Sequence, residues 1–143
     1  MTRAWILAIA IASMTPAGGR VAAQPPAQGA AVFVAYYWRA RPGQLQAYNE
    51  YIRTVAVPID EDARRAGVFE EVRTVMPVPG AATDWTHLRM FRLKDMAAAE
   101  ALGAGLDAAT LRVVPDEAQR KANSARAADL RDLVRREVWT ELR

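Results

Sequence analysis

The single histidine of the chain, His87, is the residue with the clearest capacity for acid-base chemistry. An unperturbed imidazole titrates at about pH 6.5, so it can accept or donate a proton near neutral pH. In an extended segment Trp85 and His87 share one face, and we expect Tyr36 or Tyr37 to lie beside them on a neighbouring strand. An aromatic-walled pocket with one acid-base group is typical of a small-molecule site. The structural alternative is a histidine whose hydrogen bonds are satisfied at a subunit interface or by solvent.

Tyr48 adds a second candidate from a different element. It falls in the apolar stripe of an expected helix, and we expect its hydroxyl to point into the space between helix and sheet. Asn49 lies off that stripe and is expected in solvent. The acidic run at 60–62 follows Pro58 and is expected to place negative charge at the start of a second helical segment. The catalytic candidate is therefore His87, and the pocket candidates are Tyr36, Tyr48 and Trp85.

Several chemistries are disfavoured because their residues are missing from the sequence. Cysteine is absent, which excludes a thiol nucleophile, a C-x-x-C motif and disulfides. No glycine-rich phosphate loop, G-x-S-x-G elbow or H-E-x-x-H motif occurs. These absences disfavour the classical hydrolases, kinases, Rossmann dehydrogenases and thiol oxidoreductases. One histidine offers no histidine pair for a metal ion, so we expect no metal and no cofactor.

The first 23 residues have the order of a secretory signal peptide. A basic start at Arg3 precedes an apolar run at 4–14, which is too short for a membrane span of about 20 residues. Val21-Ala22-Ala23 fits the small-residue cleavage rule, so we predict cleavage before Gln24, and a cut before Gly18 also fits the rule. Residues 24–30 are predicted to form a flexible leader, and residues 31–142 a single domain. The mature protein is expected in the periplasm or secreted, and apart from the membrane.

The charge balance gives little reason to expect a nucleic-acid partner. The full chain carries a formal net charge of +3, and the predicted cleavage would remove Arg3 and Arg20. The arginines that gather late in the chain alternate with aspartate and glutamate between residues 116 and 137. This pattern is typical of a solvated helix face rather than a phosphate-binding surface.

The apolar periodicity predicts four strands and intervening helices. The first strand is apolar on both faces, which suits a strand that is covered on both sides. Pro58 is expected to kink or break the first helix near Val57, and Gly103 and Gly105 to interrupt the second helical region. The expected elements are strand 31–40, helix 44–66, strand 68–78, strand 83–93, helix 96–102, a short turn at 107–113, helix 115–133 and strand 134–142.

This β-α-β-β-α-β order is that of the ferredoxin-like split motif, an α+β fold whose antiparallel sheet carries helices on one face. The chain resembles the dimeric α/β-barrel superfamily in two segments, AVFVAYYWRARPGQLQAYNEYI and TDWTHLRMFRLKDMAAAEAL. That superfamily includes antibiotic-biosynthesis-type monooxygenases and the NIPSNAP-like and EthD-like families. The resemblance implies a homodimer in which two sheets pack face to face. A generic α+β sandwich is the alternative fold.

Two functions fit these observations. The first is an exported homodimer that binds a small hydrophobic or aromatic ligand, or has a structural role, without catalysis. The alternative is a cofactor-independent monooxygenase or isomerase that uses His87 as acid or base. The direction of His87 separates them: a side chain aimed into a closed space opposite Tyr48 favours the enzyme, and one facing solvent or a second subunit favours the first function.

Overall fold

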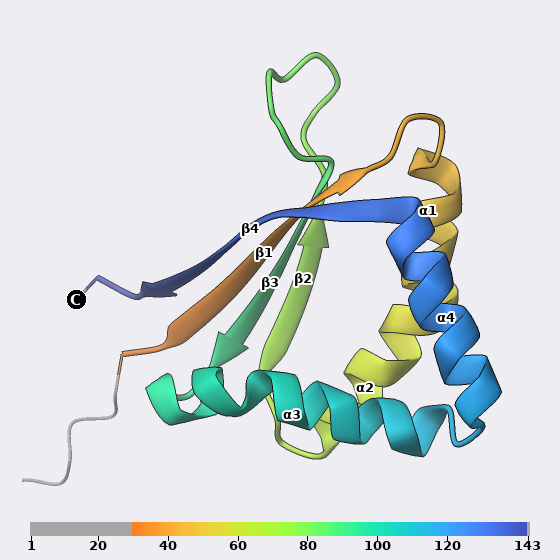
Figure 1. The fold of residues 1–143 in the computed structure, drawn as a ribbon. Coiled ribbons are helices and arrows are strands. Elements are labelled where there is room, and N and C mark those ends of the chain that lie inside the picture. Colours follow the sequence, from red (N-terminus) through yellow and green to blue (C-terminus); the bar gives the residue numbers. More distant parts are fainter. Residues whose placement is uncertain (1–29, 143) are drawn as a thin grey trace, which may run out of the picture.

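The computed structural model describes residues 30–142, and Figure 1 shows their fold. The predicted signal peptide at 1–23, and all of the predicted leader except Ala30, lie outside the described residues. The elements are β1 (Val32–Ala40), α1 (Leu45–Tyr51), the π-helical segment η1 (Ile52–Ala56), α2 (Val57–Arg65), β2 (Glu71–Val75), β3 (His87–Leu93), α3 (Met96–Val113), α4 (Glu117–Leu130) and β4 (Arg131–Thr140).

The four strands form one antiparallel sheet in the order β2-β3-β1-β4. The central pair, β1 and β3, places Trp38 opposite His87 and Tyr36 opposite Arg89. Figure 1 shows the helices gathered on one side of this sheet. The predicted α+β ferredoxin-like arrangement is confirmed.

The main core lies between the helices and the face of the sheet that they cover. Val34 of β1 and Leu93 of β3 are fully buried there, against Ala63 of α2 and Leu102 of α3. Burial of apolar surface on this scale is the main favourable term in folding. A second, more polar cluster fills the opposite end of the same layer and contains Tyr48.

The first helix does not break at Pro58 as predicted. The α-helical hydrogen bonding gives way to one π-helical segment, in which the Val57 N–H donates to the Ile52 carbonyl. Pro58 then falls in the first turn of α2, where its missing N–H costs no hydrogen bond. One nearly continuous helical path therefore carries both Tyr48 and Asp60 over the sheet.

The helical region after β3 is also continuous, where an interruption at Gly103 and Gly105 was predicted. The Asp95 carboxylate caps α3 by accepting from the Ala98 N–H at 2.8 Å, as expected for an N-cap. Gly105 has a packing role, because a Cβ at this position would lie 2.4 Å from Cγ1 of Val68. The glycine allows close approach of α3 to the segment that follows α2.

This contact predicts opposite effects for the two glycines of α3. We expect Gly105→Ala to lower the free energy of unfolding by about 1–2 kcal/mol, because the clash outweighs the gain in helix propensity. Gly103 is the matched control, since a Cβ there meets nothing within 4 Å. Gly103→Ala should raise the free energy of unfolding by up to about 1 kcal/mol. Urea unfolding measures both, and a stabilised Gly105→Ala variant would contradict this packing.

The boundaries of β2, β3 and β4 differ from those that the apolar pattern predicted. β2 is shorter than the predicted strand at 68–78, and β3 begins only at His87. β4 begins at Arg131, directly after α4, although residues 131–133 were predicted as helix. Pairing with Ala40 and a hydrogen bond from the Arg41 N–H to the Leu130 carbonyl at 2.9 Å fix this junction. The shift brings Arg131 onto the sheet.

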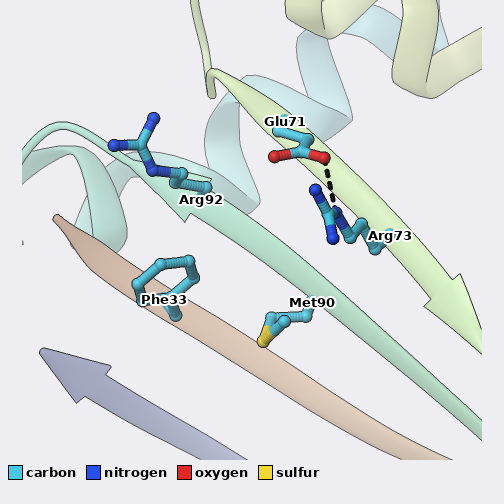
Figure 2. Close-up of a pocket in the computed structure, with 5 residues that line it drawn as sticks. All are labelled: Phe33, Glu71, Arg73, Met90 and Arg92. Atoms are coloured by element: carbon cyan, nitrogen blue, oxygen red, sulfur yellow. Dashed lines mark hydrogen bonds and ion pairs between the residues drawn. The ribbon is translucent and has the colours of Figure 1, made fainter. Parts of the chain in front are cut away.

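The second face of the sheet, called here the open face, carries Phe33 and Tyr37 of β1 with Leu88 and Met90 of β3. These side chains alternate along the strands with those that point to the helices. Figure 2 shows part of this face, where Phe33 and Met90 lie beside the charged side chains of β2 and β3. They line a shallow cavity of about 290 Å³.

Candidate functional site

The polar cluster between the sheet and the first helix is the candidate site. Its members come from elements far apart in the sequence: β1, α1, α2, β3 and the start of β4. They are Trp38, Tyr48, Asn49, Asp60, His87, Arg89 and Arg131. Most sequence-distant polar groups in a folded chain meet at the surface, so a cluster at this depth requires an explanation.

His87 lies at the centre of this cluster, with 1% of its surface exposed. It is the first residue of β3 and points toward the helices, because it pairs with Trp38 on the helix-covered face. The ring of Tyr48 packs edge-on against the imidazole, with 4.5 Å between the ring centroids. His87 and Tyr48 are thus brought together in the helix–sheet space, the direction of His87 that the sequence analysis associated with the enzymatic alternative.

Both nitrogens of the His87 ring are hydrogen-bonded. Nε2 lies 2.7 Å from the amide oxygen of Asn49, and Nδ1 lies 2.9 Å from the hydroxyl of Thr86, whose proton also has the Trp38 carbonyl as an acceptor at 3.3 Å. The amide oxygen can only accept, so this arrangement assigns the proton of the neutral ring to Nε2. Thr86 is in turn held by the Ala40 N–H, which donates to its hydroxyl at 2.8 Å. The imidazole is therefore fixed in one orientation and one tautomer.

The surroundings of His87 keep it uncharged. Burial, together with the positive charges of Arg131 and Arg89, lowers the pKa of its imidazole to about 4. A base with this pKa is poorly matched to proton abstraction near pH 7. At neutral pH His87 is thus a fixed neutral hydrogen-bonding group between two cations.

Arg131 connects the start of β4 to the aromatic part of the cluster. Its guanidinium lies over the Trp38 ring at 3.7 Å from the centroid and donates to the Tyr48 hydroxyl at 2.7 Å. Burial raises the pKa of the Tyr48 hydroxyl, although the charge of Arg131 opposes that shift. Tyr48 is therefore a neutral phenol held by a cation. The hydroxyl group of Tyr48 can also donate a hydrogen bond.

Arg89 and Asp60 form a buried ion pair that joins β3 to α2. Each side chain is only 10% exposed, and Nη2 of Arg89 donates to Oδ2 of Asp60. Burial raises the pKa of the Asp60 carboxyl, and the charge of Arg89 only partly offsets that effect. Nε of Arg89 is buried and has no hydrogen-bond partner among the described residues. The site therefore contains one buried hydrogen-bond donor that has no acceptor.

A cavity of about 290 Å³ borders the ion pair from the side of α2 and the edge strand β2. Asp60 lines it, together with the apolar side chains of Ile52, Val57 and Val72. Glu61 and Arg64 also line this cavity and contribute one negative and one positive charge. The cavity therefore links the buried polar cluster to the molecular surface.

The remaining predicted pocket residues divide between the two faces. Tyr36 is on the face of His87, stacked with Trp38 at 6.4 Å and edge-on to Phe91 at 6.0 Å between ring centroids. Trp85 precedes β3 and packs instead against Tyr37, at 5.6 Å, on the open face. The structure thus brings His87 and Tyr48 together, places Tyr36 on the same sheet face against Trp38 and Phe91, and places Trp85 on the other face.

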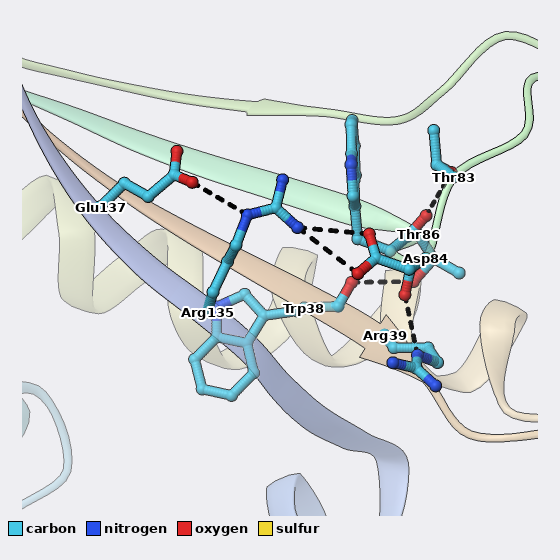
Figure 3. A network of polar contacts seen from close by, with 8 residues as sticks. Trp38, Arg39, Thr83, Asp84, Thr86, Arg135 and Glu137 are labelled. Atoms are coloured by element: carbon cyan, nitrogen blue, oxygen red, sulfur yellow. Dashed lines mark hydrogen bonds and ion pairs between the residues drawn. The ribbon is translucent and has the colours of Figure 1, made fainter.

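A separate polar region lies at one end of the open face, and Figure 3 shows its residues Asp84, Arg135 and Glu137. There Arg135 pairs with Asp84 at 3.2 Å and with Glu137 at 3.0 Å. Its guanidinium also lies 3.8 Å from the centroid of the Tyr37 ring. These contacts tie the loop before β3 to β4.

Five residues of the cluster were not predicted as site residues: Trp38, Asn49, Asp60, Arg89 and Arg131. Asn49 was expected in solvent and Asp60 at a helix terminus, yet both reach the helix–sheet layer. The position of Arg89, two residues after His87 on the same strand face, was the available signal. Asp60 and Arg131 gave none, because the continuity of the first helix and the early start of β4 were not evident.

Comparisons with solved structures show the fold clearly. The chain is similar to a NIPSNAP family protein with unknown function from Agrobacterium tumefaciens, at 13% identity and a TM-score of 0.55, over 81% of this chain and 91% of that one. It is also similar to HapK from Hahella chejuensis, at 13% identity and a TM-score of 0.52, over 78% of this chain and 92% of that one. At this identity the likeness concerns the fold alone, and it confirms the predicted ferredoxin-like fold.

Sequence comparisons add no closer relationship: no family model matches the chain, and no curated protein matches it. Within residues 30–142, no group of three or more histidine, aspartate or glutamate side chains is arranged to hold a metal ion. In the same range no helix has the length and apolar character needed to cross a membrane.

Proposed function

We propose that this protein is an exported homodimer that binds a small molecule in the space between its sheet and its first helix. The observation that carries the proposal is the buried polar cluster around His87. A cluster that served only to hold the fold would satisfy its own donors, whereas here Nε of Arg89 is buried without a partner. The adjoining cavity supplies a path and apolar contacts for a ligand.

A second copy of the chain is the proposed occupant of the open face. Phe33, Leu88 and Met90 are half-buried there, and Trp139 of β4 is 41% exposed. Apolar and aromatic side chains on one continuous sheet surface are typical of an interface. Charged neighbours such as the Arg73–Glu71 pair at 2.5 Å fit the polar rim of such an interface.

The proposal of export is based on the sequence of residues 1–23, which has the order of a signal peptide. The proposed mature chain consists of a leader at 24–30 and a single domain at 31–142. The absence of cysteine is compatible with an exported chain whose stability comes from its core and from a partner subunit. The proposed location is the periplasm or the exterior of the cell.

One observation favours the enzymatic alternative, a cofactor-independent monooxygenase or isomerase. His87 points into the helix–sheet space next to Tyr48, which is the direction that a catalytic histidine requires. Its low pKa and its two hydrogen bonds weigh toward binding, because they make the ring a weak base and leave it without the extra proton of an imidazolium acid at neutral pH. Full activity of a folded His87→Ala variant on an identified substrate would exclude the catalytic role.

Native mass spectrometry tests the proposal on protein recovered from the periplasm of a host that expresses the full chain. We expect a dimer that begins at Gln24 and carries an additional small mass. The Phe33→Glu variant should be monomeric, because a buried charge on the open face opposes pairing of the two sheets. Glu100→Gln on the exposed side of α3 is the control and should remain dimeric.

Each outcome bears on one part of the proposal. A wild-type protein that is monomeric at micromolar concentration would contradict the homodimer. A mass that includes residues 1–23 would contradict the predicted cleavage. A ligand-free dimer that also fails to bind the acids and amides described below would contradict small-molecule binding.

A further inference from the structure

We propose that the ligand of this site is an organic anion, whose charged group binds at the guanidinium of Arg89, near the hydrogen-bonded pair of Arg131 and Tyr48. The inference rests on the proposed binding function and specifies its ligand class. Carboxylates and enolates share the chemistry required, which is a compact negative charge with acceptor oxygens.

The charges of the described cluster do not balance. Arg89 and Arg131 each contribute a positive charge, while Asp60 is the only carboxylate that pairs with either of them among the described residues. His87 is neutral, so it adds no compensating or competing charge. One positive charge is therefore left in a layer where solvent is scarce, and a bound anion would neutralise it.

The donors of the cluster suit an anion rather than a neutral ligand. Nε of Arg89 is a buried donor without an acceptor, and because its neighbour Nη2 is held by Asp60, an anionic oxygen of the ligand would accept from Nε. The hydroxyl of Tyr48 accepts from Arg131 and retains its own proton for donation. Both cations act on Tyr48 and on His87, which places their charges around the same small volume.

The apolar part of the ligand would occupy the cavity between α2 and β2. Asp60, the partner of Arg89, lines that cavity, so an anion entering there meets the ion pair first. The carboxylates of Asp60 and Glu61 oppose its entry, and the guanidinium of Arg64 favours it. A cavity of about 290 Å³ fits a ligand of one ring or a short chain.

Isothermal titration calorimetry with paired probes tests the ligand class on the periplasmic protein. The probes are benzoate and benzamide, and hexanoate and hexanamide, which differ in charge but hardly in shape. We expect at least one acid to bind with a Kd of about 1 mM or lower, and at least about tenfold more tightly than its amide.

Two arginine variants locate the anion. Arg131→Gln should weaken binding of the acid about tenfold or more and leave the amide unchanged, because Arg131 is half-buried and its loss breaks no ion pair. Arg126→Gln is the matched control: its guanidinium lies 5.8 Å from the Tyr51 ring centroid, the same distance as that of Arg131, but it is exposed on α4. Binding of the acid should be unchanged in this control.

The failures of the two proposals are distinguishable. An amide that binds as tightly as its acid would overturn the anion inference and leave small-molecule binding standing. The same holds if the native protein carries a neutral ligand. Equal loss of affinity in Arg131→Gln and Arg126→Gln would overturn the assigned position. No binding of any probe, together with a ligand-free native protein, would overturn both proposals.

Discussion

The Asp60→Asn variant should lose about 3–5 kcal/mol of unfolding free energy, the largest effect we expect from a single substitution. The amide keeps the shape of the carboxylate but removes its charge. Arg89 would then hold an uncompensated positive charge at a side-chain exposure of 10%. Urea unfolding followed by tryptophan fluorescence measures the loss.

Two further variants separate the buried charge from other causes. The double variant Asp60→Leu/Arg89→Met removes both charges and should recover most of the stability, because apolar replacement of a buried pair is often neutral. Glu50→Gln breaks the exposed pair with Arg53 and should cost at most about 1 kcal/mol. If Asp60→Asn costs no more than Glu50→Gln, the described ion pair does not stabilise the fold.

Acid should destabilise this protein through His87. The pKa of the folded imidazole is about 4, below the ordinary value of 6.5, so the unfolded chain takes up the proton first. Stability from this residue is therefore complete above pH 6.5 and is lost as the pH falls toward 4. The loss should reach about 2–3 kcal/mol.

Comparison with the His87→Gln variant separates the contribution of His87 to the pH dependence of stability from that of the carboxylates. Burial raises the pKa of Asp60, whose titration therefore acts in the opposite direction, and both proteins contain it. Urea unfolding at intervals from pH 7 to pH 4 should show a steeper decline for the wild type than for the variant. Parallel pH profiles would show that His87 is not kept neutral in the folded state.

The fold was predictable because the apolar periodicity is strong in the segments that form the core. Val32, Val34, Phe91 and Leu93 share the helix-covered face with two-residue spacing, so the grouping of residues by face was predictable, although which face of the first strand meets the helices was not. The resemblance to the dimeric α/β superfamily followed from the element order. The predicted element boundaries were wrong where contacts between sequence-distant residues determine the structure. Gly105 is an example, because it lies within α3 and packs closely against Val68.

The candidate site was only partly predictable, for a physical reason. Tyr48 lies in a helical stripe that periodicity reveals, so its place in the helix–sheet space could be inferred, whereas the direction of His87 could not. Which side chains pair with Arg89 and Arg131 depends on how the helices are positioned over the sheet. Asp60 reaches Arg89 only because the π-helical segment carries the helix past Pro58, and Arg131 reaches Tyr48 only because β4 starts directly after α4.

The nuclear magnetic resonance signals of His87 provide the most direct test of a ligand site in the helix–sheet space. His87 is the only histidine of the chain, so the ring of a ¹⁵N-labelled protein without a histidine tag gives one set of signals. We predict a neutral ring protonated at Nε2 at pH 7, whose nitrogen shifts change as the tighter-binding acid is added. Ring signals that stay unmoved at saturation with a bound probe would place the ligand elsewhere and contradict the account.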